Sequence, residues 1–112
     1  MIQKLNAYGK PECVELIEGW FHETMPKLTE KVVMAFIDVD LASSTKDCLL
    51  SIWPKLIEEG VIFSHDAHFE QVDHLLNSVE FWKSNFNELP PKIEKVLGSK
   101  NLVKIKKQAN LR

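Results

Sequence analysis

Two runs of apolar residues predict the central strands of this chain. Residues 32–37 (Val-Val-Met-Ala-Phe-Ile) are apolar throughout and are bounded by Lys31 and Asp38. Residues 61–63 (Val-Ile-Phe) form a second, shorter run. Unbroken apolar runs of this length are typical of strands covered on both faces, as in a parallel sheet. We therefore predict two neighbouring buried strands.

The segment between the two runs has the periodicity of a helix over residues 43–59. Ser43 offers an N-cap for this helix. Pro54 lacks the backbone N–H group that a helix interior needs, so we expect a kink there. Gly60 is a natural C-terminal cap. The apolar residues recur at the spacing of one helix face, and they are Leu49, Leu50, Trp53, Leu56 and Ile57.

A second helix is predicted over residues 69–86, and a hairpin follows it. Pro90-Pro91 ends the helical element. Residues 93–97 and 102–105 flank a polar segment that contains glycine, which predicts an antiparallel hairpin. The apolar face of the second helix consists of Val72, Leu75, Leu76, Val79, Trp82 and Phe86.

The first thirty residues give weaker signals. Residues 1–8 are predicted to be the end of a helix that Gly9 stops. Cys13–Ile17 alternates like a short strand and is closed by Gly19. Residues 24–26 are expected to begin a helical turn or a loop.

These elements predict an α/β fold class. Strand, helix and strand in this order define a βαβ unit, whose connection is right-handed. A further helix and an antiparallel hairpin complete the predicted order. A length of 112 residues corresponds to one domain, so residues 1–112 are expected to form a single α/β domain.

Composition excludes several classes of partner. The formal net charge is −2, so the chain has no general attraction to nucleic acid or to an anionic membrane. The Lys residues between positions 100 and 107 are expected to line a solvated strand face. No stretch approaches the roughly 20 apolar residues of a membrane span. Cys13 and Cys48, without a secretory signal, fit a reducing compartment, and a cytoplasmic location is expected.

The strongest candidate site combines two polar clusters at strand ends. Asp38 and Asp40 follow the first strand, and His65 and Asp66 follow the second. Ligands of open α/β sheets collect at the carboxyl ends of the strands. Carboxylates gathered at one point repel each other, and a divalent cation relieves that repulsion. Oxygen ligands suit Mg²⁺, Ca²⁺ or Mn²⁺, whereas His65 favours a transition metal.

A structural explanation competes with this site. An Asp at a strand end often caps the following helix, and Asp40 or Ser43 can do so here. For one such acid, helix capping is the simpler explanation. For three acids at adjacent strand ends, a ligand-binding site is the better explanation. His22, His68 and His74 have no partner at ligand spacing.

Several motifs of the chain resemble the macrocin-type O-methyltransferases. The order and spacing agree over about residues 5–86. Residues 14–21 and 23–26 resemble the family motif V-x-x-x-x-G-x-F-x-x-T-L-P. Residues 36–41 match H-I-D-x-D-L-Y, and residues 44–46 match the x-T-K that follows. Leu56 and residues 60–66 match L-x-x-G-G-V-I-I-x-D-D-Y.

The resemblance implies a class I methyltransferase that uses S-adenosylmethionine and a divalent metal, with Mg²⁺ expected first. Asp38, His65 and Asp66 then correspond to metal ligands, and His65 stands where the family has an Asp. Asp40 corresponds to the general base that deprotonates a hydroxyl of a sugar or polyketide. Gly19, Trp20 and Phe21 fall where the family approaches the adenine of the cofactor.

The resemblance covers only the C-terminal half of the family's Rossmann-like sheet. The upstream half, with the first strand and its Gly-rich cofactor loop, has no counterpart in the sequence. The strand at 32–37 would then have a bare edge, and such edges tend to pair. We expect either that residues 13–17 cover this edge or that a second copy or a partner chain pairs with it.

Three functions remain open from the sequence. The first is a methyltransferase-related protein that acts on a small-molecule hydroxyl. The second is a non-enzymatic remnant or interaction module with the same fold. The third is a phosphatase of the haloacid-dehalogenase type, because Asp38-Val39-Asp40 resembles its D-x-D motif.

Overall fold

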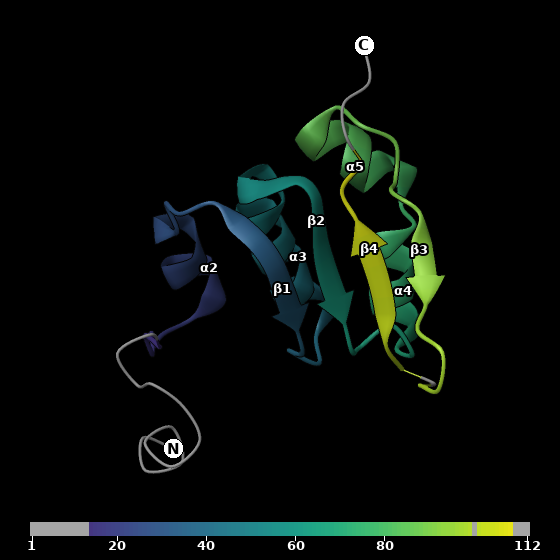
Figure 1. The fold of residues 1–112 in the computed structure, drawn as a ribbon, viewed down its shortest axis with the longest axis horizontal. Helices are drawn as coiled ribbons and strands as arrows, with labels where there is room; N and C mark the ends of the chain where they lie inside the picture. The colour runs from purple at the N-terminus through teal and green to yellow at the C-terminus, as the bar shows by residue number, and fades with distance from the viewer. Residues whose placement is uncertain (1–13, 100, 109–112) are drawn as a thin grey trace.

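The structure, a computed structural model, describes residues 14–99 and 101–108. Strands and helices alternate through most of this region (Figure 1). The elements are α2 (Phe21–Thr24), η2 (Met25–Lys27), β1 (Val32–Ile37), α3 (Ala42–Ile52), η3 (Trp53–Lys55), β2 (Leu56–Ser64), α4 (Glu70–Leu76), α5 (Val79–Phe86), β3 (Ile93–Lys95) and β4 (Val103–Lys106).

Four strands form one mixed sheet in the order β1-β2-β4-β3. β1 and β2 are parallel, whereas β4 runs antiparallel to both β2 and β3. The helices α3, α4 and α5 lie on one face of this sheet (Figure 1). The predicted fold class is therefore confirmed: a βαβ unit is followed by helices and by an antiparallel hairpin.

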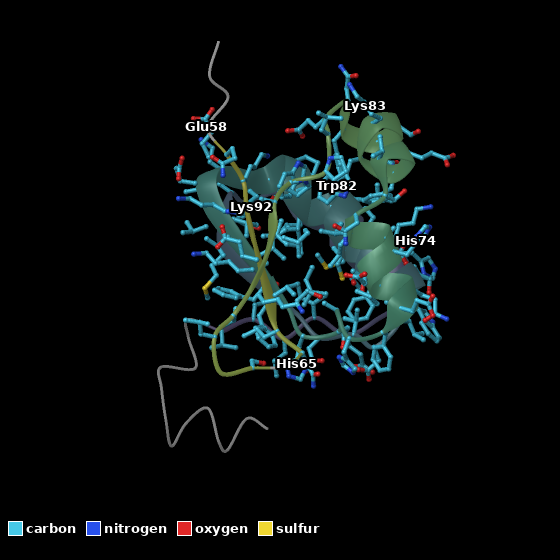
Figure 2. All side chains as sticks on the ribbon, turned by 90° about the vertical axis from the view of Figure 1, so that its right-hand side faces the viewer. Glu58, His65, His74, Trp82, Lys83 and Lys92 are labelled. Atoms are coloured by element: carbon cyan, nitrogen blue, oxygen red, sulfur yellow. The ribbon has the colours of Figure 1, made fainter. Side chains whose placement is uncertain are left out.

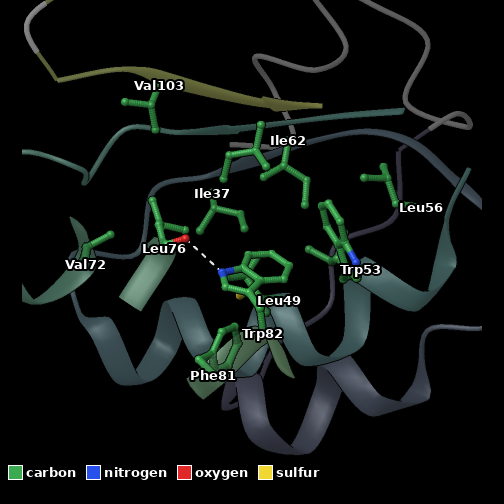
Figure 3. Packing of buried hydrophobic residues seen from close by; sticks show 13 residues of the cluster. Ile37, Leu49, Trp53, Leu56, Ile62, Val72, Leu76, Phe81, Trp82 and Val103 are labelled. Atoms are coloured by element: carbon green, nitrogen blue, oxygen red, sulfur yellow. Dashed lines mark hydrogen bonds between the residues drawn. The ribbon is translucent and has the colours of Figure 1, made fainter. Parts of the chain in front are cut away.

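The hydrophobic core lies between the sheet and the three helices (Figure 3). Trp82 of α5 is fully buried, and its indole packs edge-on against Trp53 with ring centroids 4.8 Å apart. Its Nε1 atom donates a hydrogen bond of 2.8 Å to the carbonyl oxygen of Leu76, so the polar atom of this large side chain is satisfied inside the core.

The helix predicted over residues 43–59 is wrong at its C-terminal end. α3 ends at Ile52, and Pro54 lies in the short 3₁₀ helix η3 rather than at a kink. β2 then begins at Leu56, which pairs with Val32 of β1. The chain after Pro54 therefore pairs with β1 and does not continue the helix that the periodicity predicts. Proline contributes to this ending, because it lacks the N–H group that a continuing helix would need.

Gly60 does not cap a helix but lies buried inside β2. The pairing of β1 with β2 is irregular here, because Val32 pairs with Leu56 whereas Met34 already pairs with Val61. Glu59, just before the glycine, has a φ of 68°. The extra residues of β2 form a bulge, which ordinary strand periodicity does not predict.

The helix predicted over residues 69–86 consists of two helices, α4 and α5. The side chain of Ser78 accepts the backbone N–H group of Phe81 at 3.2 Å and so caps the start of α5. Because of this break, the buried face of α5 is not the one that a continuous helix over residues 69–86 would have. Val79, predicted to be buried, is 56% exposed, and Phe81, which the prediction left out, is only 7% exposed.

The N-terminal predictions have mixed outcomes. No strand is present over residues 14–17, so the predicted strand at Cys13–Ile17 is wrong for the part that the structure describes. A strand needs a hydrogen-bonded partner, and the described residues offer none there. The turn expected at residues 24–26 is present in α2 and η2. The helix at residues 1–8, together with Cys13, lies outside the described residues.

Candidate functional site

The ends of β1 and β2 lie side by side at one edge of the sheet. Ile37 pairs with Ser64, and the backbone N–H group of His65 donates a hydrogen bond of 3.0 Å to the carbonyl oxygen of Ile37. Asp38 and His65 therefore leave the sheet from adjacent positions. Figure 2 shows His65 at this end of the sheet, far from Lys83 at the opposite end.

Asp66 is the buried member of the cluster. Its side chain is almost inaccessible, and its Oδ2 atom accepts the backbone N–H groups of Val39 at 2.8 Å and of Asp40 at 3.0 Å. These two bonds hold the loop between β1 and α3 against the end of β2. The other carboxylate oxygen of Asp66 remains as a ligand atom for a cation.

Asp38, His65 and Asp66 come together in space. Each of them offers a ligand atom, and these three atoms lie within 4.8 Å of one another. The Nδ1 atom of His65 is 3.7 Å from Oδ1 of Asp38, which is too long for a hydrogen bond. Both of these side chains are about half exposed, so solvent and solutes reach the cluster from one side.

The donor set of the cluster fits a divalent cation. Donors on one ion lie about 2.0–2.3 Å from it, so two of them are up to about 4.5 Å apart. The spread of the three ligand atoms therefore requires only small side-chain rotations to reach a common ion. Asp38 and Asp66 would supply oxygen ligands, and His65 would supply one nitrogen ligand.

Asp40 adjoins the cluster through its backbone. Its φ of 64° lies in the left-handed region, which Asp tolerates better than most residues. A cavity of about 490 Å³ opens beside it, between the start of α3 and the start of α4. Most of the lining side chains are apolar, and the full lining is Asp40, Leu41, Ala42, Ser43, Phe69, Gln71 and Val72.

Phe69 is the aromatic lining residue, and the sequence did not single it out as a site residue. It is 40% exposed, and the centroid of its ring lies 4.1 Å from that of the His68 ring. In the sequence it was only the first residue of a predicted helix. A signal was nevertheless present, since an aromatic residue placed just after a polar strand end is available to a ligand at that edge.

Gly19, Trp20 and Phe21 are the residues that the resemblance assigns to the cofactor. Gly19 and Phe21 line a different cavity of about 380 Å³, which contains neither Asp40 nor any of the three clustered side chains. Trp20 is 72% exposed. The structure therefore brings the predicted metal ligands and the backbone of Asp40 to one place, whereas Gly19 and Phe21 line a cavity that includes none of these residues.

Cys48 is a buried free thiol. It is 5% exposed in α3. Burial, and then the negative charge of Asp47, raise the pKa of the Cys48 thiol to about 11. A thiol with such a pKa is protonated at neutral pH and is a poor nucleophile.

The described fold and edge define a class of protein, an α/β protein with a polar cluster where open sheets bind their ligands. A family model described as a methyltransferase domain matches residues 3–67, which is more than half of the chain. The chain therefore belongs to the methyltransferase domain family. No curated protein matches the sequence significantly.

Solved methyltransferases share the fold. The O-methyltransferase NovP matches with a TM-score of 0.75 and 21% identity, over 93% of this chain and 41% of NovP. The calicheamicin methyltransferase CalS11 matches with a TM-score of 0.65 and 18% identity, over 81% of this chain and 36% of CalS11. An apo structure of CalS11, described as a TDP-rhamnose 3′-O-methyltransferase, matches with a TM-score of 0.63 and 18% identity, over 81% and 40% of the two chains.

The chain spans less than half of the length of these solved relatives. The predicted resemblance to methyltransferases is confirmed at the level of family and fold, and it covers part of the relatives as expected. The phosphatase interpretation of Asp38 and Asp40 stays a prediction. Within residues 14–99 and 101–108, no helix has the length and apolar character needed to cross a membrane.

Proposed function

We propose that this chain forms the metal- and acceptor-binding part of an S-adenosylmethionine-dependent O-methyltransferase. One observation carries the proposal. In a member of the methyltransferase domain family, Asp38, His65 and Asp66 gather beside Asp40 at the carboxyl edge of β1 and β2. The mechanism is that of the macrocin-type enzymes, whose motifs the chain resembles.

Asp40 acts as the general base of the proposed reaction. Its carboxylate takes the proton of the acceptor hydroxyl while the oxygen forms a bond to the methyl carbon and the bond from sulfur to that carbon breaks. S-adenosylmethionine would supply the electrophilic methyl group, and Asp38, His65 and Asp66 would hold a divalent cation whose charge would lower the pKa of the hydroxyl. Asp66 also positions Asp40, because it accepts the backbone N–H group of that residue.

The acceptor enters the cavity beside Asp40. This cavity combines a carboxylate with the wall of Phe69, so it suits a hydroxyl carried on a ring. The description of CalS11 as a TDP-rhamnose 3′-O-methyltransferase supports a sugar hydroxyl as the acceptor. A polyketide hydroxyl is the second acceptor class that the resemblance implies.

Gly19, Trp20 and Phe21 are proposed to approach the adenine of the cofactor. The match covers 41% of NovP, so the remaining contacts to S-adenosylmethionine would come from the part of the fold that this match leaves out. The proposed location is the cytoplasm. The part of the fold that supplies these remaining contacts would belong there either to the same polypeptide or to a partner chain.

Calorimetry and label transfer test this proposal together. The protein, assembled with the part of the fold that supplies the remaining cofactor contacts, is titrated with S-adenosylmethionine in the presence of a divalent cation, and transfer of a labelled methyl group to TDP-rhamnose is then measured. We expect saturable binding and transfer. Asp40→Asn should retain binding and lose at least about 100-fold of the transfer rate, because loss of a general base has effects of this size.

Asp47→Asn is the matched control, since it makes the same change in α3 and should leave transfer unaffected. Unchanged transfer by Asp40→Asn would remove Asp40 from the role of base. If this complete assembly folds but binds no S-adenosylmethionine, the result would support the second candidate function.

The second candidate function is an interaction module that pairs through β1. Among the described residues β1 pairs only with β2, so its other edge carries no strand. The strand also presents large apolar side chains, with Val33 66%, Met34 63% and Phe36 58% exposed. Apolar edges of this kind are templates for another strand, from a second copy or from a partner chain.

A further inference from the structure

We propose that His65 makes the cluster select a first-row transition metal over Mg²⁺. This inference rests on the proposed function only as far as the metal site is concerned, and it does not depend on methyl transfer. It begins from the donor atoms of the cluster. Two carboxylates and one imidazole have ligand atoms within 4.8 Å of one another.

The imidazole of His65 is held toward the carboxylate of Asp38. Its Nδ1 atom lies 3.7 Å from Oδ1 of Asp38, and an ion that binds both atoms fits this separation. The backbone N–H group of His65 is bonded to the carbonyl oxygen of Ile37, so the sheet fixes the start of the side chain. The ring lies near that of Phe36, with centroids 6.3 Å apart.

His68 provides an internal comparison. Its ring centroid lies 6.5 Å from that of His65, yet it does not belong to the group of three candidate ligands. The cluster therefore contains a single nitrogen donor, and that donor is His65. A change at His68 alters the local charge near the cluster without altering the three donor atoms.

The preference for a transition-metal ion over Mg²⁺ follows from the chemistry of the donor atoms. Mg²⁺ takes oxygen ligands in near-octahedral geometry and gives up its water ligands reluctantly. Imidazole nitrogen instead suits Zn²⁺, Co²⁺ and related ions, and affinities at such mixed sites rise from Mn²⁺ to Co²⁺. We therefore expect Co²⁺ and Zn²⁺ to bind more tightly than Mn²⁺, and Mg²⁺ to bind most weakly.

Calorimetric titration of the full chain with Co²⁺ and with Mg²⁺ tests this selectivity. The measured quantity is the ratio of the two affinities, since a change of total charge affects both ions and largely cancels in the ratio. We expect Co²⁺ to bind at least tenfold more tightly than Mg²⁺. His65→Asp, which makes the donor set entirely carboxylate, should reduce the ratio at least tenfold.

His68→Asp is the matched control, because it adds the same charge nearby and should leave the ratio unchanged. In ¹H NMR spectra, Co²⁺ should also produce a paramagnetically shifted, exchangeable imidazole signal that is absent from His65→Asp. Equal or tighter binding of Mg²⁺, no binding of either ion, or an unchanged ratio in His65→Asp would each overturn the inference. Selective Co²⁺ binding without methyl transfer would uphold it and would count against the proposed catalytic function alone.

Discussion

The Oδ2 atom of Asp66 accepts the backbone N–H group of Asp40 at 3.0 Å, across 26 positions of sequence. The same oxygen accepts the N–H group of Val39 at 2.8 Å. One buried carboxylate therefore joins the end of β2 to the loop that carries the proposed base. This gives Asp66 a structural role in addition to its proposed role as a metal ligand.

Removal of the Asp66 carboxylate should destabilise the fold. Asp66→Ala leaves two partly buried N–H groups without an acceptor, and we expect it to lower the free energy of unfolding by about 3 kcal/mol. Asp66→Asn retains one carbonyl acceptor and should lower it by about 1 kcal/mol. Urea unfolding monitored by tryptophan fluorescence measures both changes.

Asp38→Asn separates the structural role from metal binding. Asp38 is half exposed, so this change should weaken the binding of Co²⁺ and alter the free energy of unfolding by less than about 0.5 kcal/mol. Equal stability of Asp66→Ala and the unmodified protein would show that the two backbone bonds contribute nothing.

The close packing around Gly60 predicts that a side chain is not tolerated there. A Cβ atom at this position would lie 2.7 Å from Cδ1 of Leu56 and 2.8 Å from the carbonyl oxygen of Ile57. The backbone contact cannot be relieved by rotating a side chain. We expect Gly60→Ala to lower the free energy of unfolding by about 2–3 kcal/mol, measured by urea unfolding.

Gly98→Ala is the comparison for this change. Gly98 has a φ of 83°, and a Cβ atom there would meet no atom within 4 Å. Its replacement should cost about 1 kcal/mol from backbone strain alone. A smaller loss for Gly60→Ala than for Gly98→Ala would contradict the packing argument at the bulge.

The buried thiol of Cys48 predicts a loss of stability in alkali. Its pKa is raised to about 11, from an ordinary value of 9.0 in the unfolded chain. Between these values the unfolded chain has released the proton and the folded chain retains it, so the free energy of unfolding falls as pH rises. We expect a fall of up to roughly 2 kcal/mol between about pH 8 and pH 10.5.

Cys48→Ala isolates this contribution from other groups that titrate in alkali. Urea unfolding of the two proteins at both pH values should show a smaller fall for Cys48→Ala. The same fall in both proteins would mean that the thiol is not the group responsible.

The edge of β1 that none of the described strands covers predicts self-association or capture of a partner strand. A charged side chain on an edge strand opposes pairing, so Met34→Lys should reduce association at high protein concentration. Size-exclusion chromatography with light scattering measures the molar mass. Leu89→Lys, which replaces another highly exposed apolar residue away from β1, should have no effect. An unmodified protein that stays monomeric at every concentration would leave the homodimer without support.

Local patterns predicted the elements that depend on neighbouring residues. The apolar run at residues 32–37 forms β1, and the two segments predicted as an antiparallel hairpin contain β3 and β4. Strand ends with acidic residues also followed from the sequence, because parallel strands bring their carboxyl ends to one edge. The grouping of Asp38, His65 and Asp66 was accordingly within reach of the sequence.

Two features of the helical region were predicted less well. The apolar spacing over residues 69–86 predicts one continuous helix, because apolar periodicity alone does not show the local cap by which Ser78 starts a new helix. The side chain that fills the core beside Trp82 is Phe81 rather than Val79. Packing against the sheet selected this face, and helical periodicity contains no information about the sheet.

The α/β class could be predicted from the amino-acid sequence, as could the parallel pair of strands and the polar residues that end them. The start of β2, the burial of Gly60 and the bond from Asp40 to Asp66 became evident only in the folded protein. The difference lies in the range of the interactions. Hydrophobic periodicity reports the backbone conformation of adjacent residues, whereas the bond between Asp66 and Asp40 joins segments that only the folded sheet brings together.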